Sequence, residues 1–197
     1  MENKDRITEK AREMFADYGY SRVTMEELAH KLGMSKKTLY RDFKGKEAIL
    51  NEILSRFRRQ LEAELEAVYA NEQLPFEEKL NRAAVVLATR FSSLNSRFLD
   101  DLAKNAPQAS EQFTNIKKSS TIRFHALIEE GVKAGKINKK LNKSLALLLY
   151  SGLIEALLNP RLLREIPEEL QQEMPFSYQA IVEGMTEIVL NGILPRK

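Results

Sequence analysis

Cysteine is absent from this chain of 197 residues, and only two histidines occur in it. Without cysteine, the chain can form neither a disulfide bond nor a thiolate metal site. The histidines, His30 and His125, are far apart in the sequence, and neither belongs to an HExxH motif. We therefore expect no bound metal and no cofactor, with His30 in solvent and His125 partly buried.

Long hydrophobic segments are scarce as well. The longest spans residues 145–158 and is interrupted by Ser151, Gly152 and Glu155. It is shorter than the roughly 20 apolar residues that a helix needs to cross a membrane. The N-terminal residues, MENKDRITEK, are charged and lack the apolar centre of a signal peptide. We therefore expect a cytoplasmic protein with no membrane partner.

The chain also lacks a large excess of charge of one sign. Its 31 lysines and arginines stand against 28 aspartates and glutamates, which leaves a net charge of +3. The total charge therefore gives no indication of a nucleic-acid partner. The distribution is more informative, because residues 36–46 hold five cations and one anion: Lys36, Lys37, Arg41, Lys44, Lys46 and Asp42. By itself, such a run is most often a solvated helix face.

The residues before this basic run carry the signals of a short, capped helix. Thr24 and Glu27 have the spacing of a capping box, in which each side chain accepts a hydrogen bond from a backbone N–H group of the other residue. Leu28 and Leu32 then fall on one helical face. Gly33 ends the helix, because glycine adopts the left-handed conformation without a steric clash.

A second short helix follows at once. Ser35 is placed to cap its N-terminus. Leu39 and Phe43 lie one turn apart on its inner face, whereas Thr38 and the cations face outward. A capped helix, a glycine turn and a second helix that carries cations indicate a helix-turn-helix, whose second helix enters the major groove of DNA.

This segment resembles the DNA-binding domain of the TetR family of bacterial transcriptional regulators. The family pattern has a threonine before an apolar helix, a Gly–apolar–Ser turn, a Leu–Tyr pair with a following Phe, and a Lys–Glu pair before two apolar residues. A preceding helix with one apolar face also fits. Beyond Leu54 the resemblance is one of architecture only. The matching residues are Thr24, Leu28, Ala29, Gly33, Met34, Ser35, Leu39, Tyr40, Phe43, Lys46, Glu47, Ile49 and Leu50, preceded by Ile7, Ala11, Phe15, Tyr18, Gly19 and Tyr20.

The resemblance implies how the segment binds double-stranded DNA. Lys36, Lys37 and Thr38, at the start of the second helix, are the implied base readers, since lysine can donate to guanine O6 and N7. Many relatives have a small residue at position 37, so Lys37 is alternatively a phosphate contact. Arg41 would reach a base or a phosphate. The implied phosphate contacts are Tyr40, Lys46, Ser35 and Thr24, and the last two lie at helix N-termini, which favour anions.

The rest of the chain shows helical spacing throughout, with no alternation typical of β-strands. We expect helices over residues 46–69, 75–94, 96–104, 107–134, 145–158 and 178–192. The predicted fold is therefore all-α. A three-helix DNA-binding domain containing the helix-turn-helix would occupy residues 1–48, and a helical bundle for ligand binding and dimerisation would occupy residues 49–197.

By resemblance, the bundle would hold a small-molecule effector among the helices over residues 46–69, 75–94 and 109–134. The sequence gives no indication of the effector's chemistry. The candidate lining residues are apolar and mostly aromatic, although such residues at helical spacing are also typical of a filled core: Phe57, Leu87, Phe91, Phe98, Phe113 and Phe124.

Residues 145–158 are apolar on nearly every side, which predicts burial in the core or against a second subunit. In the TetR family the last two long helices form a four-helix bundle with their two-fold mates, and here these would be residues 145–158 and 178–192. Glu155 would pair at this interface or line a ligand cavity. The expected interface residues are Leu149, Leu153, Ile154, Leu157, Ile181, Met185 and Ile188.

The sequence contains no recognisable catalytic site. Residues 131–136, GVKAGK, differ from a phosphate loop because only three residues separate the glycines, and Ile137 occupies the Ser/Thr position. We interpret them as a helix end. We therefore expect no enzyme, but a homodimeric, ligand-responsive transcriptional repressor on a palindromic operator. The alternatives are a TetR-like activator and an all-helical interaction protein whose helix-turn-helix contacts proteins.

Overall fold

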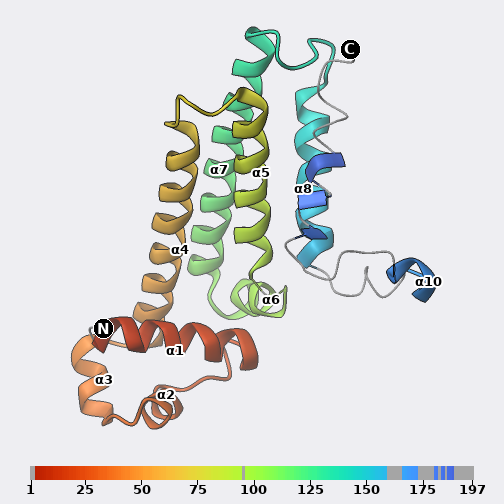
Figure 1. Ribbon diagram of the computed structural model, residues 1–197. Helices are drawn as coiled ribbons and strands as arrows, with labels where there is room; N and C mark the ends of the chain where they lie inside the picture. The colour runs from red at the N-terminus through yellow and green to blue at the C-terminus, as the bar shows by residue number, and fades with distance from the viewer. Residues whose placement is uncertain are drawn as a thin grey trace. The chain divides into compact units, whose positions relative to one another are not determined.

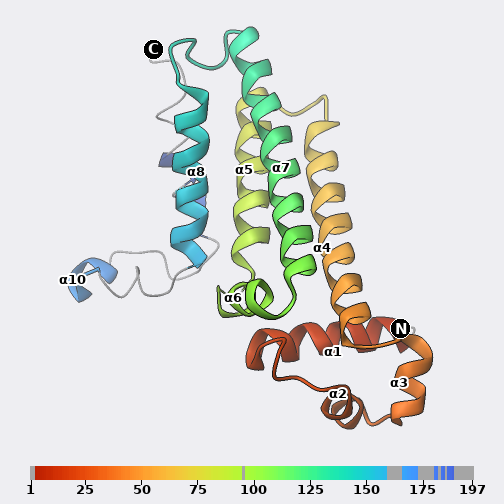
Figure 2. The ribbon, with the colours of Figure 1, turned by 180° about the vertical axis from the view of Figure 1, so that it is seen from behind.

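The computed structural model describes residues 3–94, 96–158, 166–172, 180, 181, 183, 184 and 186–188. Over these residues the chain forms helices and no strands, which confirms the predicted all-α fold (Figures 1 and 2). The helices are α1 (Asn3–Tyr18), α2 (Met25–Leu32), α3 (Lys36–Asp42), α4 (Lys46–Tyr69), α5 (Phe76–Ser92), α6 (Ser96–Asn105), α7 (Pro107–Lys133), α8 (Lys143–Leu158) and α10 (Glu168–Gln171). Residues 180, 181, 183, 184 and 186–188 are also helical, and the remainder of the predicted last helix lies outside the described residues.

Proline marks the starts of α5 and α7. Pro75 directly precedes α5, and Pro107 is the first residue of α7. Proline is suited to these positions because the first N–H groups of a helix have no intrahelical partner, and its fixed φ matches the helix. The sequence therefore sets both helix starts locally, as predicted.

Glycine sets the end of α7. The N–H groups of Lys136 and Ile137 donate to the carbonyl of Gly131 at 2.8 and 3.1 Å, and Gly135 has a φ of 72°. Gly131 also allows a close approach, because a Cβ atom there would collide with the ring of Phe76. The GVKAGK segment is thus a helix end and a packing site for α5, in agreement with its interpretation from the sequence.

The chain divides into two compact units. The first comprises Met1–Gln60 and Leu94–Ile116, and the second comprises Leu61–Ser93 and Lys117–Lys197. The boundaries between the units fall within α4, after Gln60, and within α7, after Ile116. The division into compact units does not test the predicted boundary between a DNA-binding domain and a ligand-binding domain after residue 48. That boundary stays a prediction.

The first unit has one hydrophobic core, to which α1, α2, α3, α6 and the first half of α4 contribute. Phe15 and Tyr20 meet edge-on in it, with ring centroids 5.2 Å apart. Phe98 and Leu102 of α6 are only 4% and 1% exposed, and they belong to the same core. α6 therefore packs as part of the body that carries the helix-turn-helix.

In the second unit, α5 packs against α8. It also lies beside α7, where Phe76 approaches Gly131 (Figures 1 and 2). Phe124 of α7 and Tyr150 of α8 are buried, with ring centroids 5.3 Å apart. The Tyr150 hydroxyl donates to the Ala84 carbonyl of α5, and burial raises the pKa of Tyr150 above its ordinary value. This hydroxyl satisfies its hydrogen bond within the core and joins α8 to α5.

Candidate nucleic-acid interface

The cap of α2 has the geometry that the sequence predicts. The Thr24 N–H donates to Glu27 Oε2 at 2.8 Å, and the Glu27 N–H donates to Thr24 Oγ1 at 3.2 Å. The hydrogen bonds from Thr24 hold the pKa of Glu27 below its ordinary value. Gly33 ends the helix in the left-handed conformation with a φ of 64°, and its N–H bonds back to the last turn. The helix-turn-helix thus begins with a locally fixed helix and a tight turn.

α3 is capped by Ser35, as predicted. The Thr38 N–H donates to Ser35 Oγ at 3.1 Å, and the two hydroxyl oxygens are 2.9 Å apart. Leu39 is fully buried and Phe43 is 8% exposed, so the inner face of α3 is fixed against the core. This packing turns Lys36, Lys37, Tyr40 and Arg41 toward solvent.

The outward face of α3 carries exposed side chains that are suited to a nucleic acid. Lys36, Lys37, Tyr40 and Arg41 are all exposed, and Tyr40 is 49% exposed despite its large apolar ring. Arg41 lies 3.7 Å from Asp42 through its Nε atom. Cations and an aromatic hydroxyl on one short helix can donate to phosphates and to base edges.

Lys46 lies in a different environment from the other cations. Its ammonium group donates to the carbonyls of Tyr20 and Ser21 at 2.8 and 3.3 Å, and it lies 4.4 Å from the centroid of the Tyr20 ring. Burial lowers the pKa of Lys46, against the opposing effect of Asp101 and Glu27. Its role as a phosphate contact stays a prediction. The geometry gives it a partner that the sequence did not indicate, the turn between α1 and α2.

Asp101 of α6 contacts the same turn. The Ser21 N–H donates to Asp101 Oδ2 at 2.7 Å, and Asn105 Nδ2 donates to Asp101 Oδ1 at 2.6 Å. Gly19 has a φ of 91°, and a Cβ atom there would lie 3.1 Å from Asp101 Oδ2. Asp101 and Lys46 therefore bind the N–H and carbonyl groups of one turn. Sequence reasoning missed Asp101, because nothing in the local pattern links it to a residue 80 positions earlier.

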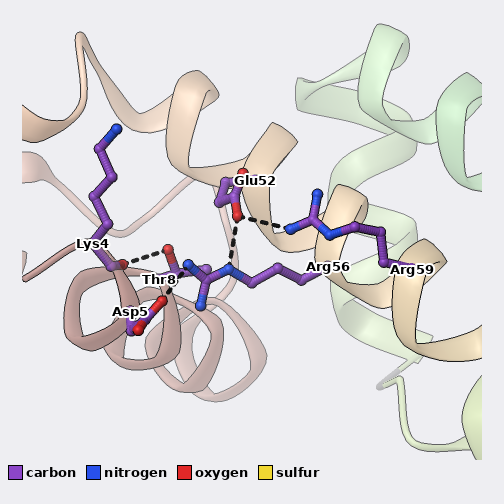
Figure 3. A network of polar contacts seen from close by, with 6 residues as sticks. All are labelled: Lys4, Asp5, Thr8, Glu52, Arg56 and Arg59. Carbon is purple, nitrogen blue, oxygen red and sulfur yellow. Dashed lines mark hydrogen bonds and ion pairs between the residues drawn. The ribbon is translucent and has the colours of Figure 1, made fainter. Parts of the chain in front are cut away.

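An ion-pair network joins α1 to the first half of α4 (Figure 3). Arg56 contacts Asp5 through Nη2 at 2.7 Å and Glu52 through Nε at 2.8 Å, and Arg59 contacts Glu52 at 3.1 Å. The hydrogen bond from Arg56 lowers the pKa of Glu52, against the effect of its partial burial. These contacts help to fix α1, and hence the helices packed on it, against α4.

The residues predicted to line an effector pocket are divided between the two units. Phe98 lies in the core of the first unit, and Phe57 packs against Phe113, with ring centroids 6.0 Å apart. In the second unit, three of the six adjoin a cavity of only about 20 Å³, beside Tyr150: Leu87, Phe91 and Phe124. These side chains mainly fill cores, and their assignment to an effector stays a prediction.

The residues predicted at a subunit interface are described only in part. Leu149 of α8 is 68% exposed. Its neighbours Leu145 and Leu148 are also exposed, by 56% and 67%. Ile188 is 74% exposed, whereas Ile181 is half-buried. The side chains of Leu153, Ile154, Glu155 and Leu157 lie outside the described residues, as does Met185. Leu145, Leu148 and Leu149 thus form an apolar face of α8 that is exposed among the described residues.

Two further observations concern metals and membranes. The described residues bring together no group of three or more acidic or histidine side chains that could hold a metal ion. In the same part of the chain, every helix is too short or too polar to span a membrane. His30 is exposed and His125 is partly buried, as the sequence predicts.

Residues 7–53 match the family described as bacterial regulatory proteins, tetR family. The chain is 27% identical over 188 residues to the uncharacterized HTH-type transcriptional regulator YvaF of Bacillus subtilis, covering 95% of this chain and 94% of that one. The structure of the ketosteroid transcriptional regulator KstR2 of Mycobacterium tuberculosis is similar, with a TM-score of 0.73 and 19% identity over 99% and 96% of the two chains. So is that of the regulator FadR of Bacillus subtilis in complex with stearoyl-CoA, with a TM-score of 0.65 and 20% identity over 96% and 98%. All three of these proteins are transcriptional regulators by their names.

Proposed function

We propose that this chain, which belongs to the tetR family of bacterial regulatory proteins, is a homodimeric transcriptional repressor that a small molecule releases from a palindromic operator. The observation that carries the proposal is the capped α2–Gly33–α3 unit. Leu39 fixes the inner face of α3, so that Lys36 and Lys37 project together into solvent. A helix of this kind is built to enter the major groove.

The proposed DNA contacts fall into two groups. Lys36, Lys37 and Thr38 open α3 and would meet base edges, with Lys37 alternatively on a phosphate. The second group would hold the DNA backbone, which positions the protein without reading sequence: Thr24, Ser35, Tyr40 and Lys46. Arg41 would reach a base or a phosphate. The Ser35 and Thr38 hydroxyls contact each other at 2.9 Å, so Ser35 orients Thr38 before DNA arrives.

The proposed dimer follows from the size of α3 and the surface of α8. A recognition helix that spans Lys36–Asp42 reads few bases, and two-fold proteins gain specificity from half-sites about 34–36 Å apart. The exposed leucines at positions 148 and 149 supply an apolar face that a second copy would cover. Together these features support one symmetric dimer on one palindrome.

Regulation would depend on the second unit. An effector releases the operator only if it binds more tightly to a conformation in which the two recognition helices no longer match the half-sites. The relative FadR is described in complex with stearoyl-CoA, which supports a small-molecule effector for this chain in general terms.

Selection of bound sequences from a random DNA pool tests the proposal. We expect an enriched palindrome whose half-sites are separated by about one helical turn. A steep fall of affinity with salt should accompany it, because phosphate contacts release counterions. Absence of any enriched sequence, together with salt-independent retention on DNA-cellulose, would instead favour a helix-turn-helix that contacts proteins.

A further inference from the structure

A second cavity lies in the second unit, where the end of α4 and the start of α5 meet α7. Its volume is about 260 Å³, and it is larger than the cavity beside Phe124 and Tyr150. The sequence predicted none of its lining. The lining residues are Tyr69, Lys79, Arg123, Ala126, Leu127 and Glu130.

The hydroxyl of Tyr69 is the most informative group of this cavity. It is buried and has no hydrogen-bond partner among the described residues. Burial raises the pKa of Tyr69, against the effect of Arg123, so the hydroxyl keeps its proton at neutral pH and remains a donor. Buried hydroxyls in folded proteins nearly always have a partner. An acceptor on a bound molecule would supply it.

Two cations stand beside Tyr69. Lys79 donates to the Tyr69 carbonyl at 3.0 Å, and the Arg123 guanidinium lies 5.0 Å from the centroid of the Tyr69 ring. One nitrogen of Arg123, Nη2, also pairs with Glu66 at 2.7 Å. A guanidinium has several further N–H donors and an ammonium has three, so both groups can still donate to a ligand. The cavity therefore offers donors from three side chains at one place.

The other residues that line the cavity limit the size and charge of a ligand. Leu127 is 6% exposed and, with Ala126, gives the cavity an apolar wall. Glu130 is exposed and adds a negative charge, which opposes a ligand with several negative charges. The volume of about 260 Å³ is below the roughly 300–1,000 Å³ of pockets for drug-sized ligands. Size and charge together disfavour a long-chain acyl-CoA.

We propose that this cavity is an effector site for a small monocarboxylic acid with an apolar body. The carboxylate accepts hydrogen bonds from the Tyr69 hydroxyl, Arg123 and Lys79, and the apolar body packs on Ala126 and Leu127. Arg123 supplies the charge-assisted part of this recognition, which is stronger than a bond between neutral groups. This inference rests on the proposed function of the chain as a ligand-responsive regulator.

Calorimetric titration of the full chain with hexanoate, benzoate and phenylacetate tests the site, with hexanol and pentanedioate as reference ligands. At least one monocarboxylate should bind about tenfold more tightly than both references, which corresponds to one charge-assisted hydrogen bond. Arg123→Gln and Tyr69→Phe should each weaken that binding several-fold, and Glu130→Gln should strengthen it. Arg82→Gln, at an exposed arginine of α5 outside the lining, is the matched control and should leave it unchanged.

Two results would overturn the inference. The first is that no monocarboxylate binds better than hexanol. The second is that Arg123→Gln binds the acid as well as Arg82→Gln does, in a variant whose melting curve shows it to be folded. The titration contains no DNA, so it tests the acid-binding site independently of the DNA selection described above. If no operator is selected but the acid still binds, the proposed function as a DNA-binding regulator is wrong and the acid-binding site stands.

Discussion

Lys36 Nζ lies 2.8 Å from Glu26 Oε2, so the first residue of the recognition helix is paired with the helix before it. The two side chains are 54% and 73% exposed. Exposed pairs of this kind contribute at most about 1 kcal/mol, and DNA phosphates can compete for the lysine. The Glu26 carboxylate would then face the operator, where its charge opposes binding. Glu26 thus pairs with Lys36 in the free protein and would compete with DNA phosphates for it.

Glu26→Gln should therefore tighten DNA binding. The change frees Lys36 and removes one negative charge from the interface, so affinity should rise roughly two- to five-fold on any sequence. Fluorescence anisotropy on operator and random duplexes measures it. Glu77→Gln makes the same change of charge at an exposed position in the first turn of α5, and it is the control. Equal behaviour of the two variants would show that Glu26 does not adjoin the DNA.

Lys36 and Tyr40 should differ in what they contribute. Lys36→Ala should relax the preference at particular operator positions, since each good base contact gives about 1–3 kcal/mol of discrimination. Tyr40→Phe removes only a hydroxyl and should lower affinity equally on good and poor sites. Binding isotherms on single-base variants of the operator separate the two. If Tyr40→Phe changes the base preference and Lys36→Ala does not, the proposed orientation of α3 is wrong.

Lys46 and Lys44 provide a matched comparison of a bound and an exposed cation. Lys46→Ala removes the donor to the carbonyls of Tyr20 and Ser21 and also the proposed phosphate contact. It should therefore lower the melting temperature and reduce the salt slope of operator binding by about one unit per half-site. Lys44→Ala removes an exposed cation outside the proposed contacts and should leave both quantities unchanged. An unchanged salt slope for Lys46→Ala would show that Lys46 does not contact a phosphate.

Asp101→Ala should loosen the turn between α1 and α2. Loss of about 1 kcal/mol would lower the melting temperature by roughly 2–4 °C in a chain of this size. Asp100→Ala, at the exposed neighbouring aspartate, is the control and should have little effect. Operator affinity should fall with Asp101→Ala alone.

The contribution of Asp101 should also depend on pH. Burial raises its pKa, but the hydrogen bonds from Ser21 and Asn105 and the charge of Lys46 outweigh burial and leave the pKa below the ordinary 3.8. The stabilisation is therefore complete above pH 3.8 and is lost as the pH falls through the lower, folded-state value. Melting temperatures of wild type and Asp101→Ala should converge in acid. A constant difference down to the lowest pH would contradict this account.

The exposed face of α8 should mediate dimerisation. Leu149→Asp would place an unpaired charge in a dry interface, so it should dissociate the dimer and abolish binding to a palindrome. Sedimentation velocity of wild type and variant at micromolar concentration measures the state. Leu170→Asp changes a leucine that is 52% exposed outside the predicted interface, and it should remain dimeric. A monomeric wild type would overturn the symmetric operator.

The sequence alone determined most of the helix-turn-helix. The Thr24–Glu27 cap, the left-handed Gly33 and the Ser35 cap were all predicted and are confirmed. Each depends on contacts between residues three or four positions apart, where backbone geometry leaves little choice. The buried position of Leu39 follows from the same helical spacing.

Tertiary structure decided what these helices contact. Lys46 reaches back 26 residues to Tyr20, and Asp101 reaches back 80 residues to Ser21. The hydrophobic periodicity of the sequence does not indicate such long-range partners, because they depend on how the helices pack against one another. The family resemblance made Phe98 a candidate for the effector pocket, whereas in the structure it lies in the core of the first unit. Only the approach of α4, α5 and α7 brings Tyr69, Lys79 and Arg123 to one cavity. A local pattern fixes which face of a helix is apolar, but the packing of whole helices fixes what lies against it.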